Sequence, residues 1–361
     1  MATANFDFKS GDQLSSRSIL IWRIIQIAVW LLGATILTCL LFYPTIGVIL
    51  FWNILIPVAP ALFVVAVGVW RNVCPLATTN LLPRQLGLSK RKKLTATQLG
   101  QFNLIAVIAL YLIVPLRHAV FNHNGVATGM MIVAMAAIGV TLGFFYEWKS
   151  AWCSGLCPVH PVEKLYGGNV LMSLPNANCD QCMNCVIPCP DSTPNMNPKI
   201  SAKTIYHKIS GLMIIGGLPG FIWGWFHVPD EAQIVSFPTF LNVYQLPVIG
   251  FAVTLVAYLI LSNVIPAKYE RKLISIFAAS GVSCYYWYRL PALLGFGKFA
   301  DDGLLINLKD VLPTWSIFAL IIATTVFFFY WLVFRKKNNR SWVVRPQFAN
   351  KEDNLKAVLS N

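Results

Sequence analysis

The sequence predicts an all-α polytopic membrane protein with about eight transmembrane helices. Of its 361 residues, 57% are hydrophobic and only 12% are charged, whereas a soluble domain is roughly 45–50% apolar and about 25% charged. The apolar residues fall into runs of about 20, the length that a helix needs to cross about 30 Å of hydrocarbon. A second observation concerns the nine cysteines, six of which lie between residues 153 and 189. That segment is therefore the first place to look for a functional site.

Eight apolar runs are long enough to span a bilayer, and their flanking charges predict the orientation of the chain. With a cytoplasmic N-terminus, the basic residues collect in the loops of one side, whereas the loops of the other side hold acidic residues. This asymmetry follows the positive-inside rule, and it accounts for the net charge of +14 better than nucleic-acid binding does. Both termini are therefore expected in the cytoplasm. The predicted spans cover residues 24–42, 46–70, 101–121, 127–146, 206–226, 246–265, 272–295 and 314–334.

Small residues within the spans predict packing rather than chemistry. Glycines recur four residues apart at Gly216, Gly220 and Gly224, a spacing that lets two helix backbones approach closely in a bilayer. Cys39 and Cys284 lie inside apolar spans, where a cysteine most simply acts as a small buried hydrophobic residue.

The strongest motif lies between the fourth and fifth predicted spans. Four cysteines there have the spacing C-x2-C-x2-C-x3-C-P, which is the bacterial ferredoxin pattern for iron–sulfur clusters. A tight loop with this spacing places three thiolates around one cluster, while the fourth cysteine, turned away by the following proline, reaches a second cluster. Zinc is the alternative, but a single zinc ion usually takes its ligand pairs from two separate turns. We therefore expect iron–sulfur ligands at Cys179, Cys182, Cys185 and Cys189.

A second element, C-x3-C-P, lies upstream of this motif at Cys153 and Cys157. In a two-cluster ferredoxin, each cluster takes its fourth ligand from the Cys-Pro pair of the other half. Cys157 is then expected to complete the cluster held by the first three cysteines of the main motif. Cys189 is expected to serve a second cluster together with Cys153.

A further candidate ligand follows the second span. Residues 70–75 have the sequence W-R-N-V-C-P and are similar to residues 153–158, C-S-G-L-C-P, as in a degenerate internal repeat. Cys74 is therefore expected to join the cluster region, with a plain interfacial thiol as the alternative. Seven cysteines leave two [4Fe–4S] clusters one thiolate short. One iron then either has a different ligand, for which His160 and Asp191 are candidates, or is absent.

These motifs divide the chain into four parts. Residues 1–146 form an N-terminal membrane region of four spans, with a Cys-Pro loop at residues 71–100. Residues 147–203 form a cytoplasmic, ferredoxin-like iron–sulfur segment. Residues 204–335 form a C-terminal membrane region of four spans, and residues 336–361 form a cytoplasmic tail.

The arrangement of spans and cysteines over residues 70–200 resembles the NapH/NosR-type membrane polyferredoxins, which are 4Fe-4S ferredoxin-type integral membrane proteins. That family includes quinol dehydrogenase subunits of nitrate reduction and the membrane regulator of nitrous oxide reduction. The resemblance implies a multi-pass protein of the bacterial cytoplasmic (inner) membrane, with the clusters on the cytoplasmic face and the six clustered cysteines as ligands. Two features depart from the family pattern: the first Cys-Pro loop lacks its upstream cysteine, and the spans after residue 245 carry no family motif.

The histidines give weaker candidates for a cofactor or substrate site. No C-x-x-C-H sequence is present, which excludes covalently attached c-type haem. His118 and His227, at the outer ends of the third and fifth spans, are candidate ligands of a b-type haem, although two unpaired interfacial histidines are the simpler interpretation. A quinone site needs a proton acceptor, and the candidates are His118, Glu163 and His160.

Together the motifs predict an electron-transfer subunit of a larger redox complex rather than a stand-alone enzyme. It would relay electrons through two 4Fe-4S clusters between the quinone pool, or a partner redox protein, and another redox centre. The expected partners are the lipid bilayer, other subunits of the complex, quinone, and an acidic soluble ferredoxin or flavoprotein. Two alternatives are a maturation or regulatory protein that supports a partner metalloenzyme, and a structural subunit. The span centres lack ionisable residues, which argues against a transporter or ion pump.

Overall fold

The computed structural model is helical almost throughout. It describes residues 10–11, 15–92, 94–146, 149–171, 173–175, 177, 204–230, 237–299, 302–336 and 342–346. The helices of the N-terminal half are α1 (Ser16–Phe42), α2 (Pro44–Val48), the π-helix η1 (Ile49–Leu55), α3 (Ile56–Val73), α4 (Pro75–Asn80), α5 (Leu82–Gln85), α6 (Ala96–Ile113), the π-helix η2 (Arg117–Phe121) and α7 (Gly125–Phe145).

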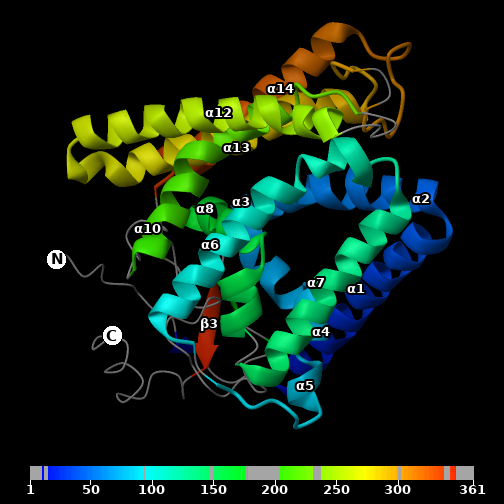
Figure 1. Ribbon diagram of the computed structural model, residues 1–361, viewed down its shortest axis with the longest axis vertical. Coiled ribbons are helices and arrows are strands. Elements are labelled where there is room, and N and C mark those ends of the chain that lie inside the picture. Colours follow the sequence, from blue (N-terminus) through cyan, green and yellow to red (C-terminus); the bar gives the residue numbers. More distant parts are fainter. Residues whose placement is uncertain are drawn as a thin grey trace.

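The remaining helices follow α7. They are the π-helix η3 (Lys149–Leu156), α8 (His160–Tyr166), η4 (Gly167–Asn169), α10 (Ile205–Leu212), η5 (Met213–Gly217), α11 (Leu218–Trp225), α12 (Phe237–Val264), η6 (Ala267–Tyr269), α13 (Glu270–Leu293), α14 (Thr314–Phe329) and η7 (Tyr330–Phe334). Two groups of helices pack on α3 and α8: α1, α4 and α7 form one, and α11 to α14 form the other (Figure 1).

Seven helical segments are long and apolar enough to cross a membrane, so the prediction of a multi-pass membrane protein is confirmed. Each of them overlaps one of the predicted spans. The side of the membrane on which each loop lies stays a prediction from the charge asymmetry. The seven segments are Ser16–Phe42, Pro44–Asn80, Ala96–Ile113, Gly125–Phe145, Ile205–Trp225, Phe240–Val264 and Thr314–Phe334.

The one predicted span that is left, residues 272–295, forms a helix but is not among these seven segments of the described chain. It corresponds to α13, whose buried side chains include Ser275, Ser283 and Arg289. α13 packs against α11 and α14 and contributes to the main hydrophobic core. A helix surrounded by other helices need not present apolar side chains to lipid, which explains its polar composition.

α13 also binds the backbone of α3 beside Pro60, a residue inside α3 that has no amide hydrogen to donate. The hydroxyl of Tyr286 in α13 donates to the carbonyl of Pro57 at 2.5 Å and accepts from the amide of Ala61 at 3.0 Å. A side chain from α13 therefore bridges two backbone groups of α3, which fixes the position of these helices relative to each other.

The glycine series predicted to pack helices does so between α11 and α12. A Cβ atom added to Gly220 would lie 2.0 Å from the carbonyl oxygen of Gly250, and one added to Gly224 would lie 2.3 Å from that of Leu246. Both positions therefore require glycine. The close approach lets the two backbones pack directly, as expected for small residues four apart in a membrane helix.

Three short strands join segments that are far apart in the sequence. β1 (Ser10–Gly11) and β2 (Leu174–Pro175) both pair in parallel with β3 (Val343–Pro346). β3 therefore lies between the two others and ties the segment after α8 to residues near both ends of the chain. Residues 178–203, which hold most of the predicted ferredoxin-like segment, lie outside the described residues.

Candidate functional site

Each Cys-Pro pair ends one helical segment and precedes the next. α3 ends at Val73, the amide of Cys74 donates to the carbonyl of Trp70 at 2.9 Å, and α4 begins at the following proline. In the same way, the amide of Cys157 donates to the carbonyl of Trp152 at 2.9 Å, after η3 and before α8. Proline disfavours helical geometry in the residue before it but is tolerated in the first turn of the next helix. Both cysteines thus lie at a helix end, although the first closes with a bond four residues back and the second with a bond five residues back.

The three described cysteines of the predicted ligand set lie in one place. Cys153 is buried beside Trp152 in a small hydrophobic cluster, and Cys74 and Cys157 pack against that cluster. Burial raises the pKa of the Cys157 thiol well above its usual range, and Glu163, Cys153 and Cys74 raise it further. A thiol in such surroundings becomes a thiolate when a metal takes the place of its proton. The fold thus brings Cys74 to the two cysteines of the second element.

The structure describes only part of the predicted ligand set. Among the described residues, no three His, Cys, Asp or Glu side chains form a group that could hold one metal ion. The other predicted ligands and one alternative lie outside the described residues; these are Cys179, Cys182, Cys185, Cys189 and Asp191.

A buried ion pair lies next to the three cysteines. Nη1 of Arg71 donates to Oε2 of Glu163 at 2.5 Å and to the backbone carbonyl of Cys153 at 3.3 Å. Trp70, which occupies the repeat position of Cys153, donates from its indole nitrogen to Oε1 of Glu163 at 2.8 Å. Arg71 and Glu163 are 5% and 3% exposed, so this pair is shielded from water. The first Cys-Pro element thus has the hydrogen-bond donor Trp70 and the cation Arg71, whereas the second element has the thiol of Cys153 at the position of Trp70.

His160 belongs to the same network. Its Nδ1 lies 3.2 Å from Nη1 of Arg71 and 3.3 Å from Oε2 of Glu163. Burial and the charge of Arg71 lower the pKa of His160 to about 4, although Glu163 opposes them, so the ring is neutral at pH 7. Burial alone would raise the pKa of Glu163, but Arg71 and His160 outweigh it and lower this pKa to about 2. In this network Arg71 and Glu163 are therefore charged, and the imidazole of His160 is neutral.

The C-terminal strand covers this network. Trp342 precedes β3, is completely buried, and donates from its indole nitrogen to the carbonyl of Gly167 at 2.9 Å. The guanidinium of Arg71 lies 5.9 Å from the centre of the Trp342 ring, within the range of a cation–π contact. A Cβ added to Gly68 would lie 2.5 Å from the carbonyl oxygen of Trp342, so glycine permits this close approach.

The two cysteines outside the motifs are half-buried free thiols, in α1 and α13 respectively. These are Cys39 and Cys284. Both lie within the helices that the sequence assigned to apolar spans, which agrees with a packing role. The five described cysteines are all free thiols.

His118 and His227 do not converge on a common ligand position. Nδ1 of His118 lies 2.5 Å from Oδ1 of Asp230, and its Nε2 lies 2.9 Å from the carbonyl oxygen of Trp225. Nδ1 of His227 lies 2.7 Å from the carbonyl oxygen of Trp223. Both ring nitrogens of His118 thus lie within hydrogen-bond distance of protein atoms. The b-type haem stays a prediction.

The neighbours of Asp230 favour its charged form. Burial by itself raises the pKa of Asp230, but His118, Arg117 and Asn122 outweigh burial and lower it below its usual range. His118 and Asp230 are thus in buried contact at this end of the molecule.

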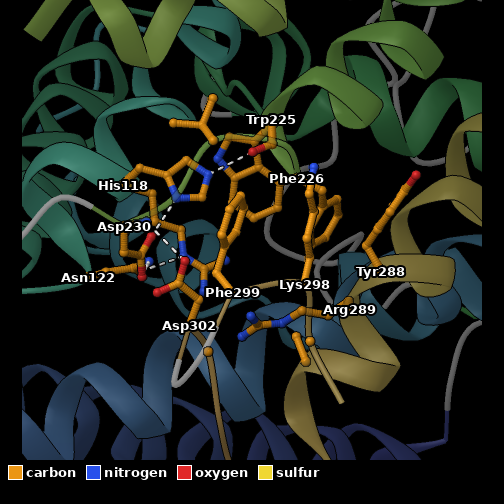
Figure 2. A pocket seen from close by; sticks show the side chains of 15 residues that line it. His118, Asn122, Trp225, Phe226, Asp230, Tyr288, Arg289, Lys298, Phe299 and Asp302 are labelled. Atoms are coloured by element: carbon orange, nitrogen blue, oxygen red, sulfur yellow. Dashed lines mark hydrogen bonds and ion pairs between the residues drawn. The ribbon is translucent and has the colours of Figure 1, made fainter. Parts of the chain in front are cut away.

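These two side chains line a cavity between η2, the end of α11, the end of α13 and the loop that follows α13. His118, Asn122 and Asp230 lie on one side of the cavity, and Tyr288 and Arg289 lie on the other (Figure 2). Sequence reasoning found His118 but not the arginines or Asp230, because nothing in their spacing predicts that residues 117, 230 and 289 meet.

The cavity and the cysteines lie at opposite ends of one helical stretch formed by η1 and α3. Asn53 in η1 accepts a hydrogen bond from Nη2 of Arg289 at 2.7 Å, and Arg71 lies near the end of α3. The stretch between them is kinked at Ala66, where the backbone is not helical.

Comparisons with known proteins add no assignment to these two regions. No protein-family model matches the chain, and neither the curated proteins nor the solved structures provided a match. The functional argument therefore depends on the cysteine motifs and on the geometry of the described residues.

Proposed function

We propose that the protein is a membrane-bound iron–sulfur electron-transfer subunit. It would relay single electrons through 4Fe-4S clusters between the quinone pool, or a partner redox protein, and another redox centre. The observation that carries the proposal is the C-x2-C-x2-C-x3-C-P motif together with the meeting of Cys74, Cys153 and Cys157.

The proposed ligands are the six clustered cysteines and Cys74. The clusters would supply one-electron chemistry, and the chain would supply the thiolates and their surroundings. The repeated Cys-Pro geometry supports this, because it presents two thiols from separate helix ends toward one buried region. The buried Trp342 ring beside Arg71 would limit the access of water here, which affects the potential of an iron–sulfur cluster.

His160 is suited to be the non-cysteine ligand. A neutral His160 that donates from Nδ1 to Glu163 leaves its Nε2 with a free lone pair, and metal-binding histidines commonly have such a carboxylate partner. Within the described part of the chain, no hydrogen bond is made by Nε2 of His160. Arg71 would hold Glu163 in place and reduce the cost of burying negative thiolates nearby.

Metal and sulfide analysis of anaerobically purified protein tests the proposal. Two four-iron clusters, or one four-iron and one three-iron cluster, correspond to about seven to eight irons per chain with acid-labile sulfide. A preparation that contains zinc but neither iron nor sulfide would contradict the proposal.

A serine variant of the main motif separates the proposed function from its alternatives. With Cys182→Ser, loss of quinol-linked electron flow in an assembled membrane protein supports electron transfer. Loss of metal from a partner enzyme, with electron flow intact, supports the maturation or regulatory function instead. Loss of the folded protein alone supports a structural role for the clusters.

The basic loops predicted to face the cytoplasm suggest an acidic soluble ferredoxin or flavoprotein as a partner. One of them contains the run of residues 90–93, K-R-K-K. Association through exposed charges weakens with salt, because the Debye length shortens to about 8 Å at physiological ionic strength. Docking that is insensitive to salt would exclude this mode of binding.

A further inference from the structure

The cavity at the start of η1–α3 carries more positive than negative charge. Its lining includes the cations Arg117, Arg289 and Lys298, whereas its two described carboxylates are Asp230 and Asp302. Asp230 is already paired with His118, and Oδ2 of Asp302 accepts a hydrogen bond from the amide of Asp230 at 2.9 Å. The arginines are thus left without a carboxylate of their own.

Arg117 is buried but presents hydrogen-bond donors to the cavity. Its side chain lies between the rings of Trp52 and Trp225, whose centres are 4.7 Å and 5.2 Å from the guanidinium carbon. Its Nε donates to Oδ1 of Asn122 at 2.6 Å. Its two terminal nitrogens make no hydrogen bond or ion pair within the part of the chain that the structure describes. Arg117 is only 3% exposed, so water does not solvate it freely.

Arg289 lies across the cavity and is fixed from its other side. Its Nη2 donates to the carbonyl of Trp52 at 2.6 Å and to Oδ1 of Asn53 at 2.7 Å. Its Nε makes no hydrogen bond of good geometry in the described residues, although Tyr285 interacts with the guanidinium. Arg289 is therefore anchored through Nη2 on the wall that faces His118 and Asp230 (Figure 2).

The loop after α13 approaches these groups closely. Gly303 has a φ of 72°, and a Cβ at this position would lie 2.1 Å from Nη1 of Arg289. Lys298 and Phe299 in the same loop also line the cavity. The loop thus closes one side of the space above Arg289 and leaves Lys298 exposed at its rim.

Two buried guanidinium groups without counter-charges are costly, because a buried charge needs a partner of opposite sign. We propose that this cavity binds a small inorganic or one-carbon anion, a halide or a simple oxyanion, between Arg117 and Arg289. The cavity has room for a few water molecules, which suits such an ion and not a larger organic anion. This site is distinct from the cysteine region and does not depend on the iron–sulfur proposal.

Anion titration of the full-length protein in detergent tests the proposal. The protein is first exchanged into sodium gluconate, an anion too bulky for the cavity, and then titrated with sodium chloride or sodium formate at constant ionic strength. Tryptophan fluorescence is the readout, because Trp52 and Trp225 flank Arg117. We expect saturable curves for chloride or formate. Curves identical to that of gluconate would overturn the proposal.

Matched variants locate the binding. Arg117→Gln should weaken the anion affinity about tenfold or more, since it removes charged hydrogen bonds. Lys309→Gln removes an exposed charge from the same loop outside the cavity lining and should leave the affinity unchanged. If Arg117→Gln does not fold, Lys298→Gln at the rim should still weaken binding by a few-fold. Unchanged affinity in Arg117→Gln, or in Lys298→Gln where that variant is used, would overturn the assignment.

A phospholipid headgroup offers the same negatively charged oxygens as a free oxyanion. Delipidated protein separates the two sources. Saturable binding of chloride or formate to delipidated protein supports the free anion. A response that requires added phosphatidylglycerol micelles, with none to chloride or formate, would overturn the free-anion assignment in favour of a lipid phosphate.

Discussion

A buried arginine lies at each end of η1–α3, Arg71 within α3 and Arg289 on α13 beside η1, but the two arginines are balanced differently. At the cysteine end, Arg71 is paired with Glu163 at 2.5 Å beside a neutral His160. At the other end, Arg289 is bound to the neutral groups of Trp52 and Asn53, with no carboxylate within ion-pair distance among the described residues. The charge of Arg71 is thus neutralised within the protein, whereas the positive charge of Arg289 can still be neutralised by a bound anion. Burial of an arginine alone therefore does not indicate its role.

The largest expected effect is on the cysteine end. Arg71→Met leaves Glu163 buried without its cation, which should reduce the free energy of unfolding by about 3–5 kcal/mol. The double variant Arg71→Met/Glu163→Leu removes both charges and should recover most of that loss. Chemical denaturation in detergent measures both. A double variant no more stable than Arg71→Met would show that the pairing of charges is not what stabilises this end.

Alanine substitutions of the glycines near Arg71 and Arg289 should also lower the stability, and the loss should be larger near Arg71. Gly68→Ala would press a methyl group against the backbone carbonyl of Trp342, which cannot move without displacing β3, and should cost about 1–3 kcal/mol. Gly303→Ala meets only the end of the Arg289 side chain but must keep a positive φ, and should cost about 1 kcal/mol. Thermal unfolding of the two variants ranks them. A larger loss for Gly303→Ala would show that the C-terminal strand is not firmly held.

The pH dependence of the cavity end follows from Asp230. Its pKa is lower in the folded protein than in the unfolded chain, so its stabilising contribution is present above about pH 4 and is lost as the pH falls through the folded pKa. Asp230→Asn should therefore show a shallower loss of stability than the native protein between about pH 5 and pH 3. Thermal denaturation over this range measures the slopes. Equal slopes would mean that the contact between His118 and Asp230 does not contribute.

The smallest effect is expected at the unbalanced end. Arg117→Met removes a buried charge that has no carboxylate partner, so in gluconate buffer it should change the free energy of unfolding by only about 1 kcal/mol or less. In chloride or formate it should lose the stabilisation that the native protein gains from the anion. If Arg117→Met in gluconate lowered the free energy of unfolding as much as Arg71→Met does, the two arginines would be equally well balanced within the protein, contrary to this account.

The spans could be predicted from the sequence because each one is recognised from consecutive apolar residues and the charges that flank them. Gly220 and Gly224 were predicted to pack from their spacing alone, and the contacts with Gly250 and Leu246 agree. α13 departed from the prediction because its polar and charged residues, among them the buried Arg289, exclude it from the helices apolar enough to span a membrane.

The cysteines and the cavity differ in how far the sequence could predict them. Spacing alone predicted the motifs, and the short repeat drew attention to Cys74, which the fold then brought beside Cys153. The pairing of Arg71 with Glu163 joins residues 92 positions apart, and that of His118 with Asp230 joins residues 112 positions apart. Such pairs leave no local pattern, because they depend on how distant helices pack.

The most direct test of the iron–sulfur account compares Cys74→Ala with Cys39→Ala after anaerobic purification. Both variants remove a half-buried thiol, but only Cys74 packs against the cysteine cluster. We predict that Cys74→Ala loses iron or changes the electron paramagnetic resonance signal of one cluster, while Cys39→Ala keeps the native iron content and spectrum. Native iron and an unchanged spectrum in Cys74→Ala would contradict its role as a ligand, and absence of iron from the native protein would contradict the whole account.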